Sequence, residues 1–366
     1  MWLNSNNMTK EYTIAVLKGD GIGPEVIAAG LKLLPIIEKQ FDLKFQIQEH
    51  LIGAASIDVN GIPLTKEVLE HCKTADAILL GAIGDPKYDN SPDLKTRPEQ
   101  GLLKLRKELG LFANIRPVTA YDALLDKSPL KREIIKGVDL VIYRELTGGI
   151  YFGEHGYTPD GVAYDHCTYS VLEIDRILHL AFKAAEQRKK HLTLVDKANV
   201  LETSRLWRKR AQILSEQYPS IQLDYLFVDN AAMQIILNPN QFDVIVTENM
   251  FGDILSDEAS VIAGSIGLLA SSSIGDGVAL FEPIHGSFPQ GAGKNIANPI
   301  AAMLSIALMF DYLKLNKAAS AIESAVKFAL EQGVRTLEIS ENNNYGTLEV
   351  TEFIVNRLAE NSEVNI

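Results

Sequence analysis

The sequence contains little cysteine, no excess of basic charge and no long apolar run. Two cysteines, Cys72 and Cys167, in 366 residues exclude a disulfide-stapled module and a cysteine-rich metal site. The net charge of −12, from 47 acidic and 35 basic residues, disfavours binding to nucleic acid or to anionic lipid. The longest apolar stretch, 299–310, is too short to cross a bilayer. We therefore expect no nucleic-acid or membrane partner.

Targeting signals are also lacking. Residues 1–7 have neither a basic region nor an apolar core, so no signal peptide is predicted. Together with two reduced thiols, this favours a cytoplasmic location. Hydrophobic residues make up 46% of the chain and charged residues 22%, which is typical of a globular protein with a large core. The length favours two domains, or one large domain with an insertion.

Short apolar runs alternate with amphipathic segments through most of the chain. The predicted strands are residues 12–17, 77–82, 138–143, 192–195, 223–228 and 242–246. The predicted helices are residues 24–39, 172–190, 202–217, 250–263, 298–312, 316–331 and 348–359. This order indicates an α/β protein with a largely parallel sheet. Residues 151–170 differ: a Thr-Pro-Asp-Gly turn between tyrosine-rich segments predicts a hairpin, which either pairs with a second subunit or lies on the surface of a monomer.

A glycine-rich sequence, GDGIGPE at 19–25, follows the first strand and opens the first helix. Pro24 suits the first turn of that helix. The third glycine comes two positions after the second, where the dinucleotide fingerprint requires three, and proline follows it. We therefore interpret the segment as a tight strand-to-helix turn rather than a standard pyrophosphate loop.

Two aspartates occur four residues apart in a predicted helix. Asp253 and Asp257 would share one helix face, where their charges repel unless a cation or a basic group lies between them. Asp229 ends another predicted strand, at the sheet edge where α/β proteins bind ligands. Oxygen ligands favour Mg²⁺ or Mn²⁺ over zinc. A metal site and a solvated helix face both remain possible interpretations.

Several basic residues lie near predicted strand ends. Arg106, Arg116 and Arg144 would suit a substrate with two carboxylates, although each could instead form salt bridges with the many acidic residues. Lys197 follows a buried strand, and a lysine near a metal there can act as a base.

Seven blocks, in this order, resemble the isocitrate/isopropylmalate dehydrogenase family of β-decarboxylating dehydrogenases. They are GDGIGPE (19–25), GLLKLR (101–106), FANIRP (112–117), RELTGGIYFG (144–153), DKANVL (196–201), NMFGDILSD (249–257) and EPIHGS (282–287) with GKNIANP (293–299). The resemblance runs from about residue 12 to the C-terminal helix. It implies a two-domain α/β fold of this family, with a twisted mixed sheet that is not a standard Rossmann fold.

The resemblance also implies a domain division and a homodimer. Residues 1–111 and 264–366 would form a cofactor-side domain, and residues 112–263 a domain for dimerisation and metal binding. The hairpin at about 151–170 would join two subunits, whose active sites would be shared.

Residue roles follow from the same resemblance. Arg106, Arg116 and Arg144 would bind the substrate carboxylates; Asp229, Asp253 and Asp257 would hold Mg²⁺ or Mn²⁺; and Asp229, with Lys197, would come from the partner subunit. Lys197 would be the base and Tyr151 the acid. Cofactor contacts would come from Glu99, His285, Gly286, Ser287, Gln290 and Asn298.

The implied activity is NAD-dependent oxidation and decarboxylation of 3-isopropylmalate to 4-methyl-2-oxopentanoate in leucine biosynthesis. Leu102 and Leu103 are apolar, as in the isopropylmalate branch, and would accept a branched alkyl group while rejecting a carboxylate. A sister activity on D-malate, tartrate or homoisocitrate is the alternative. A non-catalytic subunit is disfavoured because the candidate acid, base and metal ligands are all present.

One position departs from the family pattern. Gln290 stands where the family has an aspartate that accepts hydrogen bonds from the adenine ribose. Glutamine can still accept, but it lacks the charge that would repel a 2′-phosphate. No Lys or Arg occurs at 290 or 291 to bind that phosphate, so NAD is expected rather than NADP.

Overall fold

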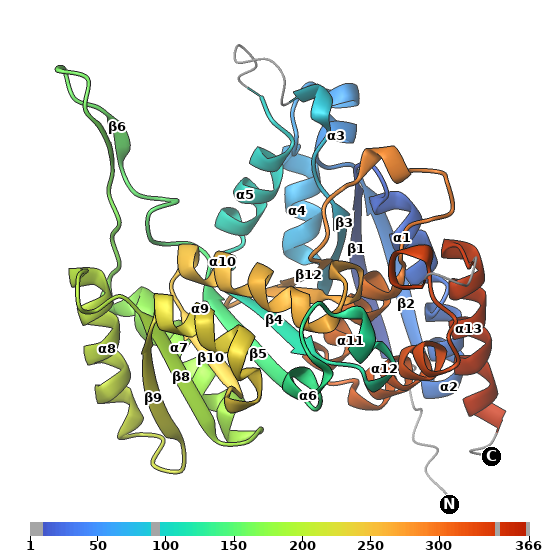
Figure 1. Ribbon diagram of the computed structural model, residues 1–366. Helices are drawn as coiled ribbons and strands as arrows, with labels where there is room; N and C mark the ends of the chain where they lie inside the picture. The colour runs from blue at the N-terminus through green and yellow to red at the C-terminus, as the bar shows by residue number, and fades with distance from the viewer. Residues whose placement is uncertain (1–9, 89–95, 341–344, 364–366) are drawn as a thin grey trace, which may run out of the picture. The chain divides into compact units, whose positions relative to one another are not determined.

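The computed structural model describes residues 10–88, 96–340 and 345–363, and divides into two compact units (Figure 1). Unit 1 comprises Met1–Leu105 and Val278–Ile366, and unit 2 comprises Arg106–Gly277. The sequence analysis placed these divisions at 111/112 and 263/264. The second division lies later because strand β11 (Ala270–Ile274) pairs with a strand of unit 2.

Unit 1 contains a parallel sheet with the strand order β2-β1-β3-β12. The strands are β1 (Lys10–Gly19), β2 (Leu43–His50), β3 (Ala77–Ala82) and β12 (Ala279–Pro283). Every residue of β3 is buried, which explains its continuous apolar sequence.

The helices of unit 1 are α1 (Gly23–Leu31), α2 (Leu34–Phe41), α3 (Ala54–Asn60), α4 (Lys66–Thr74), α11 (Ile300–Tyr312), α12 (Asn316–Glu331) and α13 (Thr347–Glu363). The single helix predicted at 24–39 is therefore wrong. Pro35 lies in the first turn of α2, because a proline ring clashes with the preceding turn of a continuous helix and cannot donate a backbone hydrogen bond. The chain breaks there into α1 and α2.

Unit 2 contains a mixed sheet with the strand order β11-β4-β5-β10-β8-β9. The other strands are β4 (Ala113–Thr119), β5 (Asp139–Glu145), β8 (His191–Asp196), β9 (Gln222–Phe227) and β10 (Val244–Thr247). Strand β4 runs antiparallel to both of its neighbours, and the remaining pairs are parallel. The predicted α/β fold with a mixed sheet is confirmed.

Alternating side chains divide the core of unit 2 into two layers. On β5, Val141 and Tyr143 join one buried cluster, whereas Leu140 and Ile142 join the other. This is the period-2 pattern of a strand covered on both faces. The helices of this unit are α6 (Arg132–Ile135), α7 (Val171–Glu186), α8 (Glu202–Ser215), α9 (Val228–Leu237) and α10 (Asn249–Ser260). Since Arg144 continues the Leu140–Ile142 alternation, it faces the layer that contains Leu255 of α10.

The predicted hairpin is confirmed. Strands β6 (His155–Tyr157) and β7 (Ala163–Asp165) form a separate antiparallel pair that extends away from the sheet of unit 2 (Figure 1). Its turn is closed by a hydrogen bond from the Gly161 N–H to the Thr158 carbonyl, at 2.9 Å. None of the described helices is long and apolar enough to cross a membrane.

Candidate active site

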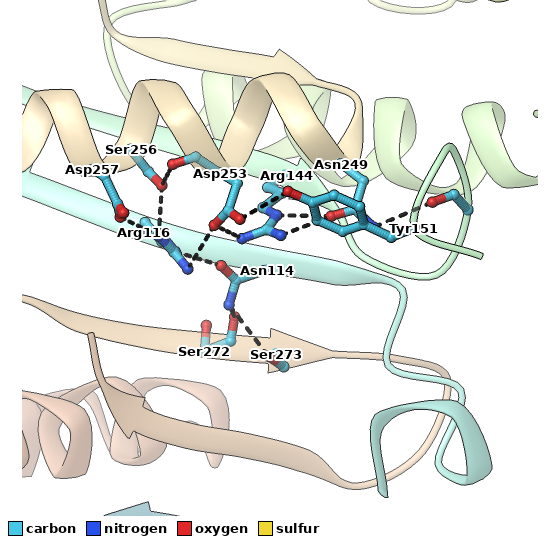
Figure 2. A network of polar contacts seen from close by, with 11 residues as sticks. Asn114, Arg116, Arg144, Tyr151, Asn249, Asp253, Ser256, Asp257, Ser272 and Ser273 are labelled. Atoms are coloured by element: carbon cyan, nitrogen blue, oxygen red, sulfur yellow. Dashed lines mark hydrogen bonds and ion pairs between the residues drawn. The ribbon is translucent and has the colours of Figure 1, made fainter. Parts of the chain in front are cut away.

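The helix predicted to carry two aspartates is α10, and its polar residues form one stripe. Their spacing of three and four residues places them on a single face of a helix. The members of the stripe are Asn249, Gly252, Asp253, Ser256 and Asp257. Arginines of β4 and β5 lie against this stripe and contact Asp253 and Asp257 (Figure 2). The two carboxylates are therefore compensated by basic groups in this structure.

Arg144 of β5 is buried, with 7% of its side chain exposed. Its Nη1 donates to Asp253 Oδ1, and its Nε and Nη2 donate to Asn249 Oδ1 at 3.0 and 2.8 Å. Burial lowers the pKa of this guanidinium to about 10, against the opposing effect of the Asp253 charge. The group remains a cation at neutral pH and can attract an anionic ligand.

Arg116 of β4 contacts the same stripe one turn further along α10. Its Nη1 donates to Ser256 Oγ at 2.6 Å and to Asp257 Oδ1 at 3.2 Å, and its Nη2 lies 3.8 Å from Asp253 Oδ1. The positive charge of Arg106 also lowers the pKa of Arg144, which places the third predicted arginine in the electrostatic neighbourhood of this cluster. Three cations thus lie around one pair of carboxylates.

Tyr151, the predicted acid, reaches the cluster from the loop after β5. Its hydroxyl donates to Asp253 Oδ2 at 3.2 Å, and its ring centroid lies 5.9 Å from Arg144 Cζ. Partial burial, followed by the Asp253 charge, raises the pKa of this phenol. The hydroxyl therefore keeps its proton at neutral pH, as a proton donor requires.

Lys197 and Asp229 form a separate pair. Lys197 directly follows β8, and its Nζ donates to Asp229 Oδ1 at 2.8 Å. The expectation that Asp229 ends a strand needs correction: β9 ends at Phe227, and Asp229 lies in the first turn of α9. The Lys197 hydrogen bond lowers the pKa of the Asp229 carboxyl. Within the described ranges, these two residues make no hydrogen bond or ion pair to Asp253 or Asp257.

The remaining predicted substrate residues lie on α5 (Glu99–Glu108). Glu99, Leu102, Leu103 and Arg106 have the spacing i, i+3, i+4 and i+7 and share one helix face. Leu103 is 48% exposed, an unusual position for leucine unless a ligand or another surface covers it. A Cβ on Gly84 would lie 3.1 Å from Glu99 Oε1 and 3.6 Å from Ser287 Oγ, so Glu99 and Ser287 border the same turn.

The interpretation of the glycine-rich segment as a tight turn is confirmed. Gly19 and Gly21 have φ values of +71° and +57°, and a Cβ on either would overlap a backbone carbonyl. The Asp20 carboxylate between them accepts hydrogen bonds from the backbone N–H groups of Ala54, Ala55 and Gly84 at 2.9–3.0 Å. The Asp20 carboxylate therefore joins the glycine-rich turn to the start of α3 and to the segment after β3.

Two predicted cofactor residues carry buried polar atoms without a partner among the described residues. These atoms are His285 Nε2 and Asn298 Nδ2. Burial lowers the pKa of His285, so the ring is neutral. Gly286 and Gln290 of the same loop are exposed, and Ser287 is buried, with its carbonyl accepting from the Ile22 N–H at 2.7 Å. An unpaired buried donor or acceptor is costly, so these two atoms are available to a polar partner.

Metal ligands do not converge within one chain. Among residues 10–88, 96–340 and 345–363, no group of three or more His, Cys, Asp or Glu side chains could hold a metal ion. Asp253 and Asp257 provide two carboxylates, and a divalent cation requires further oxygen ligands.

Two amides and one phenol in this region make contacts that were not predicted from the sequence. Asn249 and Asn114 accept hydrogen bonds from Arg144 and Arg116, and the Tyr169 hydroxyl accepts one from the Asn249 N–H at 3.0 Å. Asn249 and Asn114 both lie inside the quoted sequence blocks. An amide carries no charge and does not titrate, so the sequence alone gives no sign that it orients an arginine.

Comparisons with known proteins agree on one family. Residues 13–354 match the family described as isocitrate/isopropylmalate dehydrogenase. The "3-isopropylmalate dehydrogenase" of Bacteroides fragilis is 51% identical over 347 residues, which cover 94% of this chain and 98% of that protein. The protein of the same description from Moorella thermoacetica is 51% identical, covering 95% and 99%. Among solved structures, isocitrate dehydrogenase from Methylococcus capsulatus has a TM-score of 0.84 and 32% identity, covering 95% and 99%.

Proposed function

The chain belongs to the isocitrate/isopropylmalate dehydrogenase family, and from this membership we propose that it oxidises and decarboxylates 3-isopropylmalate to 4-methyl-2-oxopentanoate, in leucine biosynthesis, with NAD and a divalent cation. The observation that carries the proposal is the pair of arginines that contact Asp253, of which Arg144 is buried and Arg116 is partly buried. Arg116 and Arg144 present fixed cations beside a carboxylate and a protonated phenol. A hydroxy acid with two carboxylates matches that arrangement.

Substrate binding is assigned to Arg106, Arg116 and Arg144. Guanidinium groups bind carboxylates in a bidentate manner, and burial of Arg144 strengthens the attraction because little water screens it. The ion pairs with Asp253 and Asp257 keep these cations compensated until a ligand arrives.

The carboxylates of α10 fit a divalent cation. Asp253 and Asp257 supply hard oxygen ligands on consecutive turns, and Asp229 of the partner subunit would supply the third carboxylate. This donor set suits Mg²⁺ or Mn²⁺. The ion would replace the arginines as the counter-charge of Asp253 and release them toward the substrate.

The loop from His285 to Asn298 fits a dinucleotide. Its two unpartnered buried atoms, His285 Nε2 and Asn298 Nδ2, require polar partners that a bound NAD could provide. Glu99, near Ser287, would lie at the nicotinamide end, and Gly286 leaves the backbone of the loop accessible. Gln290 can accept from ribose hydroxyls, and the absence of Lys or Arg at 290 and 291 favours NAD over NADP.

Two side chains would move protons. When bound, NAD would accept the hydride from C2, and the cation would polarise the C2 oxygen. The partner subunit's Lys197 would take the C2 hydroxyl proton at Nζ, a role supported by its position beside Asp229. Tyr151 would deliver a proton from its hydroxyl to the carbon that loses carbon dioxide.

A homodimer is supported by the surface of unit 2. Large apolar side chains are exposed on the hairpin arm and on α7, α9 and α10, namely Tyr157, Leu172, Met233, Leu237 and Ile254. Burial of such apolar groups against a second subunit is favourable. A symmetric dimer would bury them and bring Lys197 and Asp229 to a second subunit's α10. The two reduced thiols support a cytoplasmic location.

The decisive measurement is NADH formation by the purified protein with 3-isopropylmalate. We expect turnover with Mg²⁺ or Mn²⁺, loss of activity in EDTA, and recovery when the metal is restored. NADP⁺ tested in parallel should be the poorer oxidant. D-malate, tartrate and homoisocitrate are the comparison substrates, and a higher kcat/KM with any of them would transfer the proposal to that sister activity. No NAD reduction with any of these acids would reject a dehydrogenase function.

A further inference from the structure

Arg116 and Arg144 each have the Nε edge of the guanidinium against a side-chain amide. Asn249 Oδ1 accepts from both Nε and Nη2 of Arg144, at 3.0 and 2.8 Å. Asn114 Oδ1 accepts from Nε of Arg116 at 2.7 Å. Figure 2 shows both amides beside their arginines, Asn114 from β4 and Asn249 from the start of α10. The same arrangement, an asparagine Oδ1 that accepts from an arginine Nε, therefore occurs twice in one cluster.

The orientation of both amides is determined by what their nitrogens contact. Asn249 Nδ2 donates to the Gly148 carbonyl at 3.2 Å, and Asn114 Nδ2 donates to Ser272 O and Ser273 Oγ, both at 3.3 Å. An amide nitrogen cannot accept a hydrogen bond, so each oxygen must face its arginine. Both asparagines are 1% exposed, so water cannot substitute for these partners.

The backbone of Asn249 is fixed as well. It is the first residue of α10, and its N–H is one of the helix-start donors that have no partner inside the helix. The Tyr169 hydroxyl accepts this hydrogen bond at 3.0 Å. Gly149, in the loop that leads to Tyr151, packs so closely against Tyr169 that a Cβ on this glycine would overlap the phenol oxygen. Tyr169 therefore holds both the start of α10 and this loop. Asn249 thus joins Arg144, the start of α10 and the loop of the candidate acid.

A neutral acceptor has an electrostatic consequence that a carboxylate would not have. Asp253 already contacts both guanidinium groups. Arg116 also contacts Asp257. A further carboxylate in place of either amide would neutralise the cation that the substrate must use, because ion pairs in a site with little water are weakly screened. An amide oxygen orients the guanidinium by hydrogen bonds and leaves its charge unchanged.

We propose that Asn114 and Asn249 are positioning residues that hold Arg116 and Arg144 through neutral amide oxygens and so keep both guanidinium charges available for the carboxylates of the substrate. This inference rests on the proposed function for the identity of the substrate. It adds two residues that touch neither substrate nor cofactor and act only through the arginines.

The test is the isosteric change Asn249→Asp, with Asn114→Asp as an independent second variant. Loss of a charge-assisted contact to one carboxylate corresponds to about a 10- to 100-fold weaker interaction. We therefore expect KM for 3-isopropylmalate to rise about 10- to 100-fold in either variant, with KM for NAD changed less than about threefold. The ratio of variant to wild-type KM should decrease at lower pH, since protonation of the new aspartate restores a neutral acceptor.

Asn240→Asp is the matched control, because Asn240 donates to the Ile134 and Lys136 carbonyls and has no hydrogen bond to an arginine among the described residues. A purely structural role of Asn249 would instead lower the thermal midpoint and give no pH-dependent recovery of KM. A folded Asn249→Asp variant with unchanged KM for the acid, or with equal changes in both KM values, would overturn the proposal.

The two hypotheses can fail separately. Wild-type turnover tests the proposed function, and the variants test the amides. If the wild type does not oxidise 3-isopropylmalate, calorimetric titration with malate still measures dicarboxylate binding by the arginines. Weaker malate binding in Asn249→Asp and Asn114→Asp, but not in Asn240→Asp, would sustain the positioning role, whereas equal binding in all four proteins would reject it.

Discussion

At the scale of single residues, Tyr151 carries a proton and lies beside Arg144 and Asp253. Its raised pKa keeps the phenol neutral at pH 7, and its hydroxyl is oriented by Asp253. Because general acid catalysis contributes about 10²–10⁴-fold, Tyr151→Phe should lower kcat by that factor. KM for the acid should change little, since phenylalanine keeps the ring near Arg144. Steady-state NADH formation measures both values, and a variant that keeps more than about a tenth of kcat would exclude Tyr151 as the proton donor.

Glu248, the residue before α10, is a buried carboxyl that the proposed reaction does not use. Burial, assisted by the charge of Glu145, raises its pKa from 4.5 to about 7, although a hydrogen bond from Cys167 and the Phe251 N–H oppose this. The folded protein holds this proton at a pH where the unfolded chain has lost it. The folding free energy contributed by this group is therefore fully present below about pH 4.5 and is lost as pH rises toward about 7.

Glu248→Gln should remove this pH dependence. The free energy of unfolding of the wild type should decrease between about pH 5 and 7 by an amount on the order of 3 kcal/mol, and the variant should show a flatter profile. Urea unfolding at a series of pH values measures this. Glu145, whose pKa is also raised by burial, leaves a residual slope of the same sign. Glu352→Gln, on the exposed face of α13, is the control, and identical slopes in wild type and Glu248→Gln would contradict the assignment.

At the scale of elements, α10 and β5 approach so closely that only glycine fits between them. A Cβ on Gly252 would lie 2.7 Å from Cβ and Cγ of Arg144. Alanine favours a helix over glycine by about 1 kcal/mol, whereas overpacking costs about 1–3 kcal/mol. Gly252→Ala should therefore lower the thermal midpoint and raise KM for the acid, because the clash displaces Arg144. Gly277→Ala, whose added Cβ meets no atom within 4 Å, should change neither value. A Gly252→Ala protein as stable and as active as wild type would show that α10 can shift without cost.

Predictability from sequence also varies by element. The spacing of Asp253 and Asp257 correctly predicted a shared helix face, because a helix of known period needs no tertiary information. The roles of Asn114, Asn249 and Gly252 could not be predicted, since they exist only when β4, β5 and α10 lie side by side. Pro35 was present in the sequence and could have divided the first predicted helix. Strands β2, β4, β11 and β12 were missed. Strands β4, β11 and β12 mix polar and apolar residues without a clear period, whereas β2 has apolar residues at the alternate positions 43, 45 and 47 that were not interpreted as a strand.

At the scale of the whole molecule, the candidate groups for the carboxylates of the acid and those for the dinucleotide belong to different units. Unit 2 carries the arginines, Asp253 and Tyr151, and unit 1 carries the loop that contains His285. Lys197 and Asp229 also belong to unit 2 but pair with each other, without a bond to Asp253 among the described residues. The proposed sharing of the site between two subunits would account for the separation of Lys197 and Asp229 from the cluster of their own chain.

Mixed dimers of two inactive variants provide the test of sharing. Lys197→Ala lacks the proposed base, and Asp253→Asn lacks a proposed metal ligand, so each homodimer should have little activity. Random assortment makes about half of the dimers mixed, and one site of each mixed dimer would combine an intact Asp253 with the other subunit's intact Lys197. Equal amounts of the two variants, denatured together and refolded, should therefore recover about a quarter of wild-type kcat with unchanged KM.

The expected recovery of a quarter of the activity depends on which residues meet across the dimer. A second pair of variants therefore distinguishes a shared active site from recovery caused by the exchange of subunits alone. Asp253→Asn mixed with Tyr151→Phe should recover almost nothing, since Tyr151 and Asp253 belong to one chain's cluster and no site would then contain both intact residues from the same subunit. Refolded wild type measures the yield of the procedure. Two results would contradict sharing: equal recovery from both mixtures, or no recovery from the Lys197→Ala and Asp253→Asn mixture when wild type refolds. Either result would place Lys197 outside the site that contains Asp253. Another base, from the same chain as the arginine cluster, would then be required.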